Sequence, residues 1–475
     1  MNDTGSKTTP RPGSWRVRPH EQRGILLTGD IITALLALLV SLYVWGQRDV
    51  WFKFSLTFLQ ERVAFWFYLL PLCWLILLVG LYDAHLAHNW RKTVRGIAIA
   101  ALIGLGVYAL VYVLAEGSLN RIGIAAFLVT ASILTLLWRL AYIRIFTTSA
   151  LNRRLLVVGA GAAGQRLAEA YKNLWPPPFF LIGFVDDDPQ KLGKQLEGYS
   201  VLGSSNNLLE LVAKEGVSDI VVAITGEMKG STFQTILDAQ ERGIEVTPMP
   251  TLYEEMMGRV PVHHLESEWL LRSFVDQARV GGFYEATKRL LDILGSLVGL
   301  ALLALIYPVV SILILLDSGS PVIYKQIRSG KGGKPYQAYK FRTMRQDAEK
   351  NGVQLTQEKD ERITKVGIFL RKTHIDETPQ FLNVLRGEMS LVGPRSERPE
   401  WIAEFQKQIP FYRARLLVKP GLTGLAQVSY SYYTTVEEMA IKLEYDLFYI
   451  KHRNLFLDIV ILLRTVGQVF GLRGR

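Results

Sequence analysis

Two adjacent carboxylates, Asp376 and Glu377, stand directly before Thr378-Pro379 in the C-terminal part of the sequence. Threonine followed by proline predicts a helix N-cap and first helical residue, so both acids are expected just outside a helix N-terminus. One explanation is structural, because free N–H groups and the helix dipole favour anions there. The other is chemical: neighbouring side chains diverge, so one carboxylate could act as a nucleophile while the other holds a metal.

Basic side chains on both sides of this pair are the groups that phosphoryl chemistry requires. Arg371 lies just before the pair and is placed to hold a phosphate. After the pair, the sequence SLVGPR predicts a rigid turn that presents Arg395. Before the pair, Lys340 and Arg342 alternate with apolar residues, as on a strand with one charged face. Single basic residues are usually solvated, so it is their clustering that points to a phosphate-binding site.

An apolar run over residues 290–316 precedes these motifs and contains Pro308. Its length would allow it to cross a membrane. Lysine and arginine flank both of its ends, which predicts that both ends lie in the cytoplasm. A proline inside a helix removes a backbone hydrogen bond and kinks the helix. We therefore expect a re-entrant membrane helix over 285–317, with an ordinary kinked spanning helix as the alternative.

The N-terminal part of the chain predicts a membrane domain. Residues 1–22 are polar and basic and contain three prolines, which predicts a disordered cytoplasmic tail. Four apolar runs follow within 23–150, each close to the roughly 20 residues that a spanning helix needs. Lysine and arginine concentrate before the first run, between the second and third, and after the fourth. This pattern predicts a four-helix transmembrane bundle with both ends in the cytoplasm.

Residues 151–262 alternate strand and helix patterns, which predicts a parallel sheet in a Rossmann-like α/β domain. Gly159, Gly161 and Gly164 follow the first strand and open a helix, and Asp186 ends the next strand. Together they form the dinucleotide-binding fingerprint in its proper context. A bound nucleotide or nucleotide-sugar and a purely structural or regulatory domain both stay open, because a fold can outlast its ligand.

The remaining segments complete the predicted organisation. A linker covers 263–284 and begins with His263-His264, which we interpret as a surface pair because no ligand spacing surrounds it. A mixed α/β catalytic domain covers 318–475. Amphipathic sequence at 439–463 is predicted to lie against the membrane surface.

The bulk composition fits a membrane protein with large globular parts. The chain has 475 residues, 49% of them hydrophobic, and a net charge of +11. The positive charge is interpreted as the positive-inside bias plus attraction to anionic headgroups. No nucleic-acid-binding motif is visible, so nucleic acid is not an expected partner. The single cysteine, Cys73, excludes an intramolecular disulfide.

Several ordered motifs resemble those of the large monotopic polyprenyl-phosphate glycosyl-1-phosphate transferases, bacterial enzymes that initiate exopolysaccharide, capsule and O-antigen assembly. The N-terminal helices and the middle domain also resemble the large members, so the resemblance covers the whole chain. The motifs are QIRSG at 326–330, YKFRTM at 339–344, LRKTHIDETPQFLNVLRGEMSLVGPR at 370–395, KPGLTGLAQV at 419–428 and EYDLFYIKHRNLFLDIVILLRT at 444–465.

The resemblance implies a two-step reaction. Asp376 matches the nucleophile that attacks the sugar-bearing phosphorus of a UDP-sugar, UDP-glucose or UDP-galactose, and releases UMP. Polyprenyl (undecaprenyl) phosphate then attacks the aspartyl-phosphosugar. Glu377 matches the acid that holds Mg²⁺. The matching motifs also put forward substrate-binding residues, which are Arg371, Lys340, Arg342, Arg328, Pro394, Arg395 and Lys419.

Two further expectations concern location and assembly. The catalytic domain is expected on the cytoplasmic face of the bacterial inner membrane, and a two-fold homodimer is the simplest oligomer. Two departures stand out. The family's Asp-Glu-Leu-Pro is Asp-Glu-Thr-Pro here, and its helix-breaking Ser-Pro is Tyr307-Pro308. The second change puts the contribution of a small hydroxyl in doubt.

Two rival functions follow from other features. The glycine-rich loop suggests a membrane-bound NAD-dependent nucleotide-sugar epimerase or dehydratase. Such enzymes need a Tyr-x-x-x-Lys pair on a helix of the same domain, whereas Tyr336 and Lys340 lie far away in a strand-like segment. A non-catalytic regulator of polysaccharide assembly would need neither the carboxylate pair nor the cation cluster.

Overall fold

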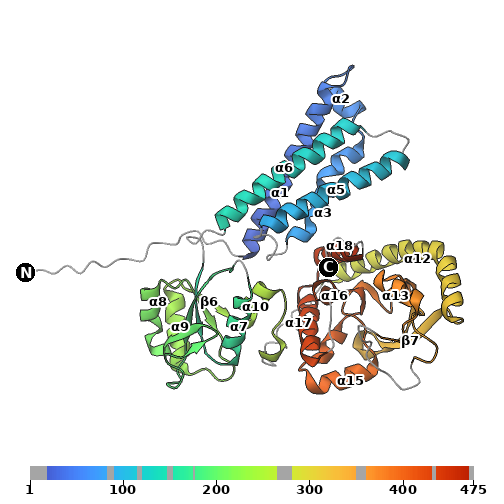
Figure 1. The fold of residues 1–475 in the computed structure, drawn as a ribbon. Helices are drawn as coiled ribbons and strands as arrows, with labels where there is room; N and C mark the ends of the chain where they lie inside the picture. The colour runs from blue at the N-terminus through green and yellow to red at the C-terminus, as the bar shows by residue number, and fades with distance from the viewer. Residues whose placement is uncertain are drawn as a thin grey trace, which may run out of the picture. The chain divides into compact units, whose positions relative to one another are not determined.

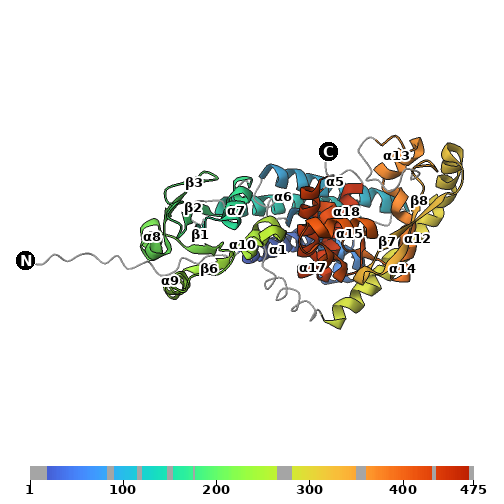
Figure 2. The same ribbon diagram turned by 90° about the horizontal axis from the view of Figure 1, so that it is seen from below.

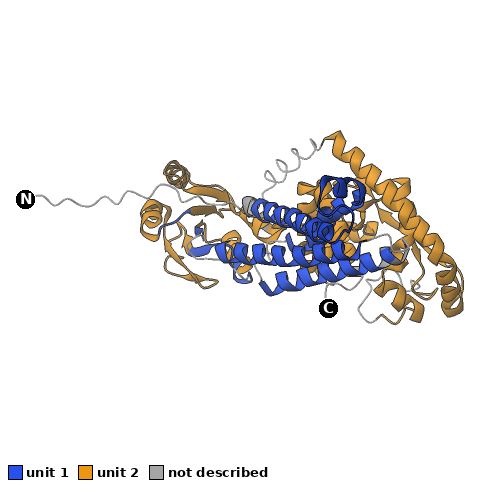
Figure 3. Ribbon diagram, turned by 90° about the horizontal axis from the view of Figure 1, so that it is seen from above, with its two compact units in different colours: residues 1–155, 171–182, 216–218 blue, residues 156–170, 183–215, 219–475 orange. Residues whose placement is uncertain are grey.

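The computed structural model describes residues 19–82, 90–114, 120–146, 153–174, 177–264, 281–348, 360–430 and 435–469. Most of the predicted tail lies outside these ranges. Its last four residues belong to helix α1, which begins at Pro19, so the tail prediction is wrong for them. Proline suits a first helical turn because the N–H it lacks would have no partner there. Figure 3 distinguishes two compact units: residues 1–155, 171–182 and 216–218, and the rest of the chain.

The N-terminal part is helical. Four of its helical stretches, and α12 further on, are long and apolar enough to cross a membrane. Side chains such as Phe58, Phe67, Trp74 and Phe127 form a common buried core between these helices. The elements are α1 (Pro19–Gln47), α2 (Leu56–Glu61), η1 (Phe65–Leu69), α3 (Leu70–Leu78), η2 (Val79–Tyr82), α5 (Trp90–Leu114) and α6 (Arg121–Phe146).

A buried ion pair joins the first and last of these helices. Arg139 Nη2 on α6 lies 2.6 Å from Asp30 Oδ2 on α1, and both side chains are excluded from solvent. Arg139 also donates to the Leu81 carbonyl oxygen at 3.2 Å. Charges in an apolar bundle are costly unless they are paired, so this contact fixes how α6 lies along α1.

The middle domain is built on a six-stranded sheet in the order β3-β4-β2-β1-β5-β6. The pairs β2–β4 and β5–β6 are parallel, as predicted, while β3 is an antiparallel edge strand. Helices α7, α8, α9 and α10 surround the sheet (Figure 1). The strands are Arg154–Val158, Phe180–Val185, Gln195–Leu196, Tyr199–Gly203, Asp219–Val222 and Glu245–Pro248; the helices are Ala162–Lys172, Leu208–Glu215, Gly230–Glu241 and Met249–Met257.

The C-terminal part is a mixed α/β domain that follows the long helix α12 (Gly282–Ser318). Two small sheets, the antiparallel pair β7–β8 and the parallel pair β9–β10, lie among short helices. The strands are β7 (Ile323–Ser329), β8 (Pro335–Phe341), β9 (Ser390–Val392) and β10 (Gly421–Thr423); the helices are α13 (Lys365–Lys372), η7 (Ile375–Gln380), α14 (Phe381–Arg386), α15 (Pro399–Gln408), η8 (Tyr412–Leu417), α16 (Leu425–Ser429), α17 (Val436–His452) and α18 (Leu455–Val469).

Helix α12 contains Pro308 and is bent, as Figure 1 shows. Proline is a sufficient cause of a bend, since it removes one helical hydrogen bond and its ring displaces the preceding turn. Figure 2 shows the helix running along the β7–β8 hairpin and α14. Its outward leucines, Leu290, Leu294, Leu302 and Leu305 among them, are 55–76% exposed. A continuous apolar surface of this kind fits a lipid environment rather than water.

The two ends of α12 are fixed to the C-terminal domain in different ways. At its start, the buried Asp458 carboxylate of α18 accepts from Lys288 Nζ at 2.9 Å and from Tyr284 Oη at 3.0 Å. Tyr449 Oη donates to the same carboxylate at 2.7 Å. Beyond the bend the contacts are apolar, where Val310 and Ile314 pack against Phe341 and Leu370.

Helix α17 is a core helix, which contradicts the predicted membrane-surface location for the first part of 439–463, up to His452. Met439, Leu443, Leu447 and Ile450 belong to the main core of the C-terminal domain. Three of its charged residues, Lys442, Glu444 and Asp446, are buried as well, because they pair with side chains from distant parts of the chain. The exposed apolar side chains lie on α18 instead, at Phe456, Ile459 and Val466.

The segment that follows α10 belongs to the core of the C-terminal domain rather than to the middle domain. Val260 and Val262 are buried in the same cluster as Leu443. Val260 N donates to the Glu444 carbonyl oxygen at 3.1 Å. The predicted domain boundary at 262 therefore falls inside a shared structural element. Of the predicted linker, residues 265–280 lie outside the described ranges.

Candidate active site

The carboxylate pair lies in η7, a short 3₁₀ helix that leads directly into α14. Asp376 and Glu377 occupy its first turn, after His374, whose φ of 57° turns the chain out of α13. Thr378 Oγ1 donates to the Ile375 carbonyl oxygen at 2.7 Å, so it is not the helix N-cap that we predicted. The pair thus sits inside a tight helical turn and not ahead of one.

Glu377 is held by two cations from different parts of the chain. Its Oε1 accepts from Lys340 Nζ at 2.6 Å and from Arg395 Nη2 at 2.5 Å. Arg395 Nη1 also approaches Oε2 at 3.1 Å, which makes the contact bidentate. Burial alone would raise the pKa of Glu377, but Arg395 and Lys340 outweigh it and hold that pKa well below its usual value.

Asp376 has the opposite electrostatic environment, although it is the next residue. Its side chain is buried, at 8% exposed. Burial, followed by the adjacent Glu377 carboxylate, raises the pKa of Asp376 against the attraction of Lys340, Arg371 and Arg395. Two neighbouring acids with oppositely shifted pKa values are a common sign of separate chemical roles.

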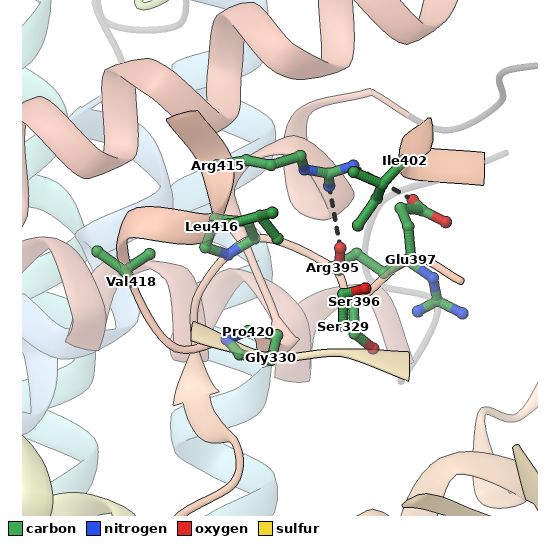
Figure 4. A pocket seen from close by; sticks show the side chains of 11 residues that line it. Ser329, Gly330, Arg395, Ser396, Glu397, Ile402, Arg415, Leu416, Val418 and Pro420 are labelled. Atoms are coloured by element: carbon green, nitrogen blue, oxygen red, sulfur yellow. Dashed lines mark hydrogen bonds and ion pairs between the residues drawn. The ribbon is translucent and has the colours of Figure 1, made fainter. Parts of the chain in front are cut away.

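The turn that carries Arg395 is set by backbone packing. Gly393 N donates to the Thr423 carbonyl oxygen at 2.9 Å, next to the β9–β10 pair. A Cβ at Gly393 would lie 2.5 Å from the Lys419 carbonyl oxygen, so only glycine permits this approach. Arg415 Nη2 donates to the Arg395 carbonyl oxygen at 2.9 Å (Figure 4). The small cavity at this turn, about 10 Å³, has room for about one water molecule.

A buried ion network supports this turn from behind, and the sequence did not reveal it. Lys442 Nζ lies 2.5 Å from Glu397 Oε1, and Arg415 Nη2 lies 2.8 Å from Asp446 Oδ2. Arg328 joins the network 3.8 Å from Glu397 Oε2. Burial alone would raise the pKa of Glu397, but Lys442 and Arg415 hold it at about 2. The only signal in the sequence was the regular appearance of charged residues within the apolar pattern of α17.

The structure brings together some of the predicted site residues and separates others. Lys340, Arg395 and the two acids form one cluster, with Arg371 close enough to act on Asp376 electrostatically. Arg371 Nε itself donates to Thr343 Oγ1 at 2.9 Å.

Four further predicted residues have different surroundings. Arg328 donates to the Ser396 carbonyl oxygen at 2.9 Å and thereby supports the turn, while Pro394 lines its cavity. Arg342 instead donates to Ser318 Oγ at 3.0 Å and holds the end of α12. Lys419 lines a separate cavity near the start of α12.

The glycine-rich loop of the middle domain has the predicted form. Gly159 has φ +109°, and a Cβ at Gly164 would lie 2.2 Å from the Gly159 carbonyl oxygen, so both positions require glycine. Nothing lies within 4 Å of a Cβ built at Gly161, which leaves that side of the loop open. Asp186 Oδ2 accepts from Ala160 N at 2.7 Å, so this carboxylate binds the backbone of the loop itself. Nucleotide binding at this loop stays a prediction.

Comparison with known proteins identifies the family. Residues 283–472 match a family model described as bacterial sugar transferase, and residues 77–239 match one described as CoA-binding domain. The chain is 40% identical over 321 residues to the UDP-glucose:undecaprenyl-phosphate glucose-1-phosphate transferase of Klebsiella pneumoniae, covering 67% of this chain and 68% of that protein. The chain belongs to the bacterial sugar transferase family.

Other sugar transferases of this family show the same relationship. The UDP-glucose:undecaprenyl-phosphate glucose-1-phosphate transferase of Escherichia coli K12 is 33% identical, over 67% of this chain and 68% of that protein. The UDP-N-acetylgalactosamine-undecaprenyl-phosphate N-acetylgalactosaminephosphotransferase of Aeromonas hydrophila is 39% identical, over 48% of this chain and 54% of its own length. The chain is therefore an enzyme of the phosphotransferase type, and its apolar helices agree with a membrane protein.

Proposed function

We propose that this enzyme transfers a sugar 1-phosphate from a UDP-sugar to undecaprenyl phosphate and releases UMP, as the first membrane step in the assembly of a bacterial surface polysaccharide. The observation that carries the proposal is the buried Asp376 beside a Glu377 that Lys340 and Arg395 hold in place. The names of the relatives support the reaction class and differ in the sugar. UDP-glucose and UDP-galactose are the donors we favour.

In the first step, a carboxylate oxygen of Asp376 attacks the sugar-bearing phosphorus. The bond from that phosphorus to the bridging oxygen breaks, and UMP leaves with the electron pair. In the second step, an oxygen of the lipid phosphate attacks the same phosphorus and displaces the Asp376 carboxylate, which regenerates the enzyme. Lys340 and Arg395 supply fixed positive charge next to the phosphates, where it stabilises the developing negative charge.

The two carboxylates also fit a magnesium ion. Mg²⁺ in phosphate-transferring sites is usually held by one or two carboxylates together with substrate phosphates, and it keeps several waters. Asp376 and Glu377 supply that donor set, and no cluster of three or more metal-binding side chains occurs among the residues that the structure describes. Glu377 would hold the ion, which would neutralise charge on the diphosphate when bound. Glu377 would then exchange its contacts with Lys340 and Arg395 for the metal.

The rival epimerase function has less support from the site. Tyr336 and Lys340 lie on strand β8. The epimerase motif instead needs its tyrosine and lysine on one face of a helix. Lys340 is also engaged by Glu377. The lipid-facing side of α12 instead favours a membrane-bound acceptor, which we place on the cytoplasmic face of the inner membrane, with α12 re-entering that face.

The experiment is a trap for the covalent intermediate. The full chain in detergent is mixed with Mg²⁺ and a UDP-sugar without the lipid. The mass of the intact protein is then measured by mass spectrometry. We expect one phosphosugar adduct and one UMP per active chain, and neither in Asp376→Asn. The exposed Asp347 provides a matched control, since Asp347→Asn should form the adduct like the wild type. Full turnover by Asp376→Asn would refute the mechanism.

A further inference from the structure

A cavity beside the first turns of α12 gathers cations that the proposed transfer does not use. It has about 50 Å³ of space, enough for several water molecules, because one water requires roughly 10–15 Å³. Five basic residues line it, against two carboxylates. The basic residues are Lys288, Arg289, Lys331, Lys419 and Arg453.

The two carboxylates at this cavity already have partners. Asp292 Oδ1 accepts from Ser390 Oγ at 2.9 Å and from Leu391 N at 2.8 Å. Glu285 Oε1 lies 3.3 Å from Arg453 Nη1. The acidic groups therefore neutralise only part of the positive charge that faces the cavity.

Among the basic residues, Lys331 and Lys419 lack such partners within the described ranges, whereas Lys288 and Arg289 have them. Lys288 pairs with Asp458, and Arg289 donates to the carbonyl oxygens that end α14. Neither Lys331 Nζ nor Lys419 Nζ forms a hydrogen bond or ion pair with any residue in the described part of the chain. Burial, followed by Arg289 and Lys331, lowers the pKa of Lys419, so these cations repel one another. An anion in the cavity would relieve that repulsion.

The position of the cavity on α12 points to the kind of anion. Arg289 and Asp292 line the cavity, while Leu290, Leu294 and Leu297 on the same turns are 50–56% exposed. The cavity thus lies where the lipid-facing surface of α12 begins. A lipid fits this border with its phosphate in the cavity and its chains along the leucines. A soluble nucleotide would not use the apolar surface.

We infer that this cavity binds the phosphate of an anionic lipid, with Lys331 and Lys419 as its contacts. Asp376 and Glu377 line no part of it, so it is separate from the carboxylate cluster. The phosphate could belong to undecaprenyl phosphate, in which case the inference rests on the proposed function and the cavity receives the acceptor. It could also belong to a bilayer phospholipid such as phosphatidylglycerol, which would anchor α12.

The test compares the wild type with the double variant Lys331→Gln/Lys419→Gln. The full chain in neutral detergent is titrated with undecaprenyl phosphate, phosphatidylglycerol or phosphatidylcholine, and bound lipid is counted by native mass spectrometry. We expect the double variant to bind an anionic lipid at least tenfold more weakly. The matched control is Lys407→Gln, because Lys407 is an exposed lysine of α15 outside the cavity. This control should bind like the wild type.

The pattern of loss separates the two sources. A selective loss of undecaprenyl phosphate, with normal phosphosugar trapping on Asp376 but little lipid product, assigns the cavity to the acceptor. A loss of phosphatidylglycerol as well assigns it to anionic lipids in general. Equal binding of every lipid by the wild type and the double variant overturns the inference. Lipid counting does not depend on turnover, so a wild type that traps no phosphosugar would count against the proposed function alone.

Discussion

At the scale of single residues, the site depends on a difference between two adjacent acids. Glu377 is neutralised by Lys340 and Arg395 and stays ionised, whereas Asp376 is buried next to that negative charge. A nucleophile that is poorly solvated and poorly paired is more reactive than one held in an ion pair. The arrangement therefore supports the proposed division of roles, in which Asp376 attacks and Glu377 binds the metal.

This difference predicts a pH dependence. Asp376 must be ionised to attack, and its pKa is raised by burial and by Glu377. The rate of phosphosugar formation should therefore fall on acidification at a higher pH than for an ordinary aspartate. Glu377→Gln removes the neighbouring charge, lowers the pKa of Asp376 and should move the acid limb to lower pH, although the maximal rate drops. Single-turnover UMP release from pH 4 to 9 measures the acid limb of each enzyme. Acid limbs that coincide in the wild type and Glu377→Gln would contradict the prediction.

A second residue-scale prediction concerns Lys442 behind the Arg395 turn. Lys442→Met leaves the Glu397 carboxylate buried without its closest cation, and breaking a buried pair costs about 3–5 kcal/mol. The midpoint of thermal unfolding in detergent should fall accordingly. The pKa of Glu397 lies at about 2, below its unfolded value, so wild-type stability from this group is lost as pH falls from about 4.5 to about 2.

In Lys442→Met that acid-dependent loss should be smaller, because the pKa of Glu397 is less depressed. The control is Lys407→Met, which alters an exposed pair and should change stability by less than about 0.5 kcal/mol. Identical midpoints in the two variants would show that the network contributes nothing to the turn.

The sequence was sufficient to predict part of this site. The acids, Lys340 and Arg395 were named from residue type and clustering, and the structure places them together. Arg342 was grouped with Lys340 because alternate residues on a strand share a face, but β8 ends at Phe341, so the alternation no longer holds. The partners of Lys442 lie tens of residues away, and no local pattern reports them.

At the scale of elements, α12 and α17 show opposite outcomes. The proline in α12 and its apolar length were readable from the sequence, and the helix is long, bent and exposed along its leucines. Helix α17 carries more charged residues for its length than α12, yet much of it is buried. A hydrophobic pattern gives the periodicity of a helix, but it does not distinguish charges that face water from charges that face buried partners.

The bend in α12 carries an element-scale prediction. Pro308→Ala restores the missing hydrogen bond and should straighten the helix. The segment beyond the bend would then pull away from Phe341, against which the Tyr307 ring packs at 5.7 Å between centroids. We expect at least a tenfold loss of lipid product. Labelling of single cysteines placed at Phe283 and Lys325 with a membrane-impermeant reagent should show both on one face in the wild type.

A fully active Pro308→Ala enzyme with unchanged labelling would show that activity does not require the bend. Opposite-face labelling of the wild type would replace the re-entrant helix by a spanning one. The two measurements are independent, since a spanning helix could also be bent.

At the scale of the whole molecule, the segment after α10 connects two domains through buried charge. Arg259 Nε lies 3.3 Å from Glu444 Oε2 on α17, and Glu254 on α10 accepts from Lys451 at 2.9 Å. The sequence predicted the two domains but not this connection. In the sequence, Val260 and Val262 look like the end of the middle domain just before a linker, whereas they are core residues of the next domain.

The connection predicts a pH-dependent stability. Burial raises the pKa of Glu444 to about 7, against the opposing effect of Arg259. A carboxyl with a raised pKa contributes stability that is fully present below about pH 4.5 and is lost as pH rises through about 7. The difference corresponds to about 3 kcal/mol at 1.36 kcal/mol per pKa unit. Glu444→Gln should remove this dependence, which thermal unfolding at pH 5 and pH 8 measures; an unchanged slope would contradict it.

The Asp458 carboxylate has a consequence for how the enzyme is made. It accepts hydrogen bonds from Lys288 and Tyr284 on α12, yet it lies in α18, the last helix that the structure describes. Asp376 therefore leaves the ribosome well before the group that anchors the start of α12. A chain interrupted before α18 contains the carboxylate pair but lacks the contacts that Asp458 makes with Tyr284 and Lys288.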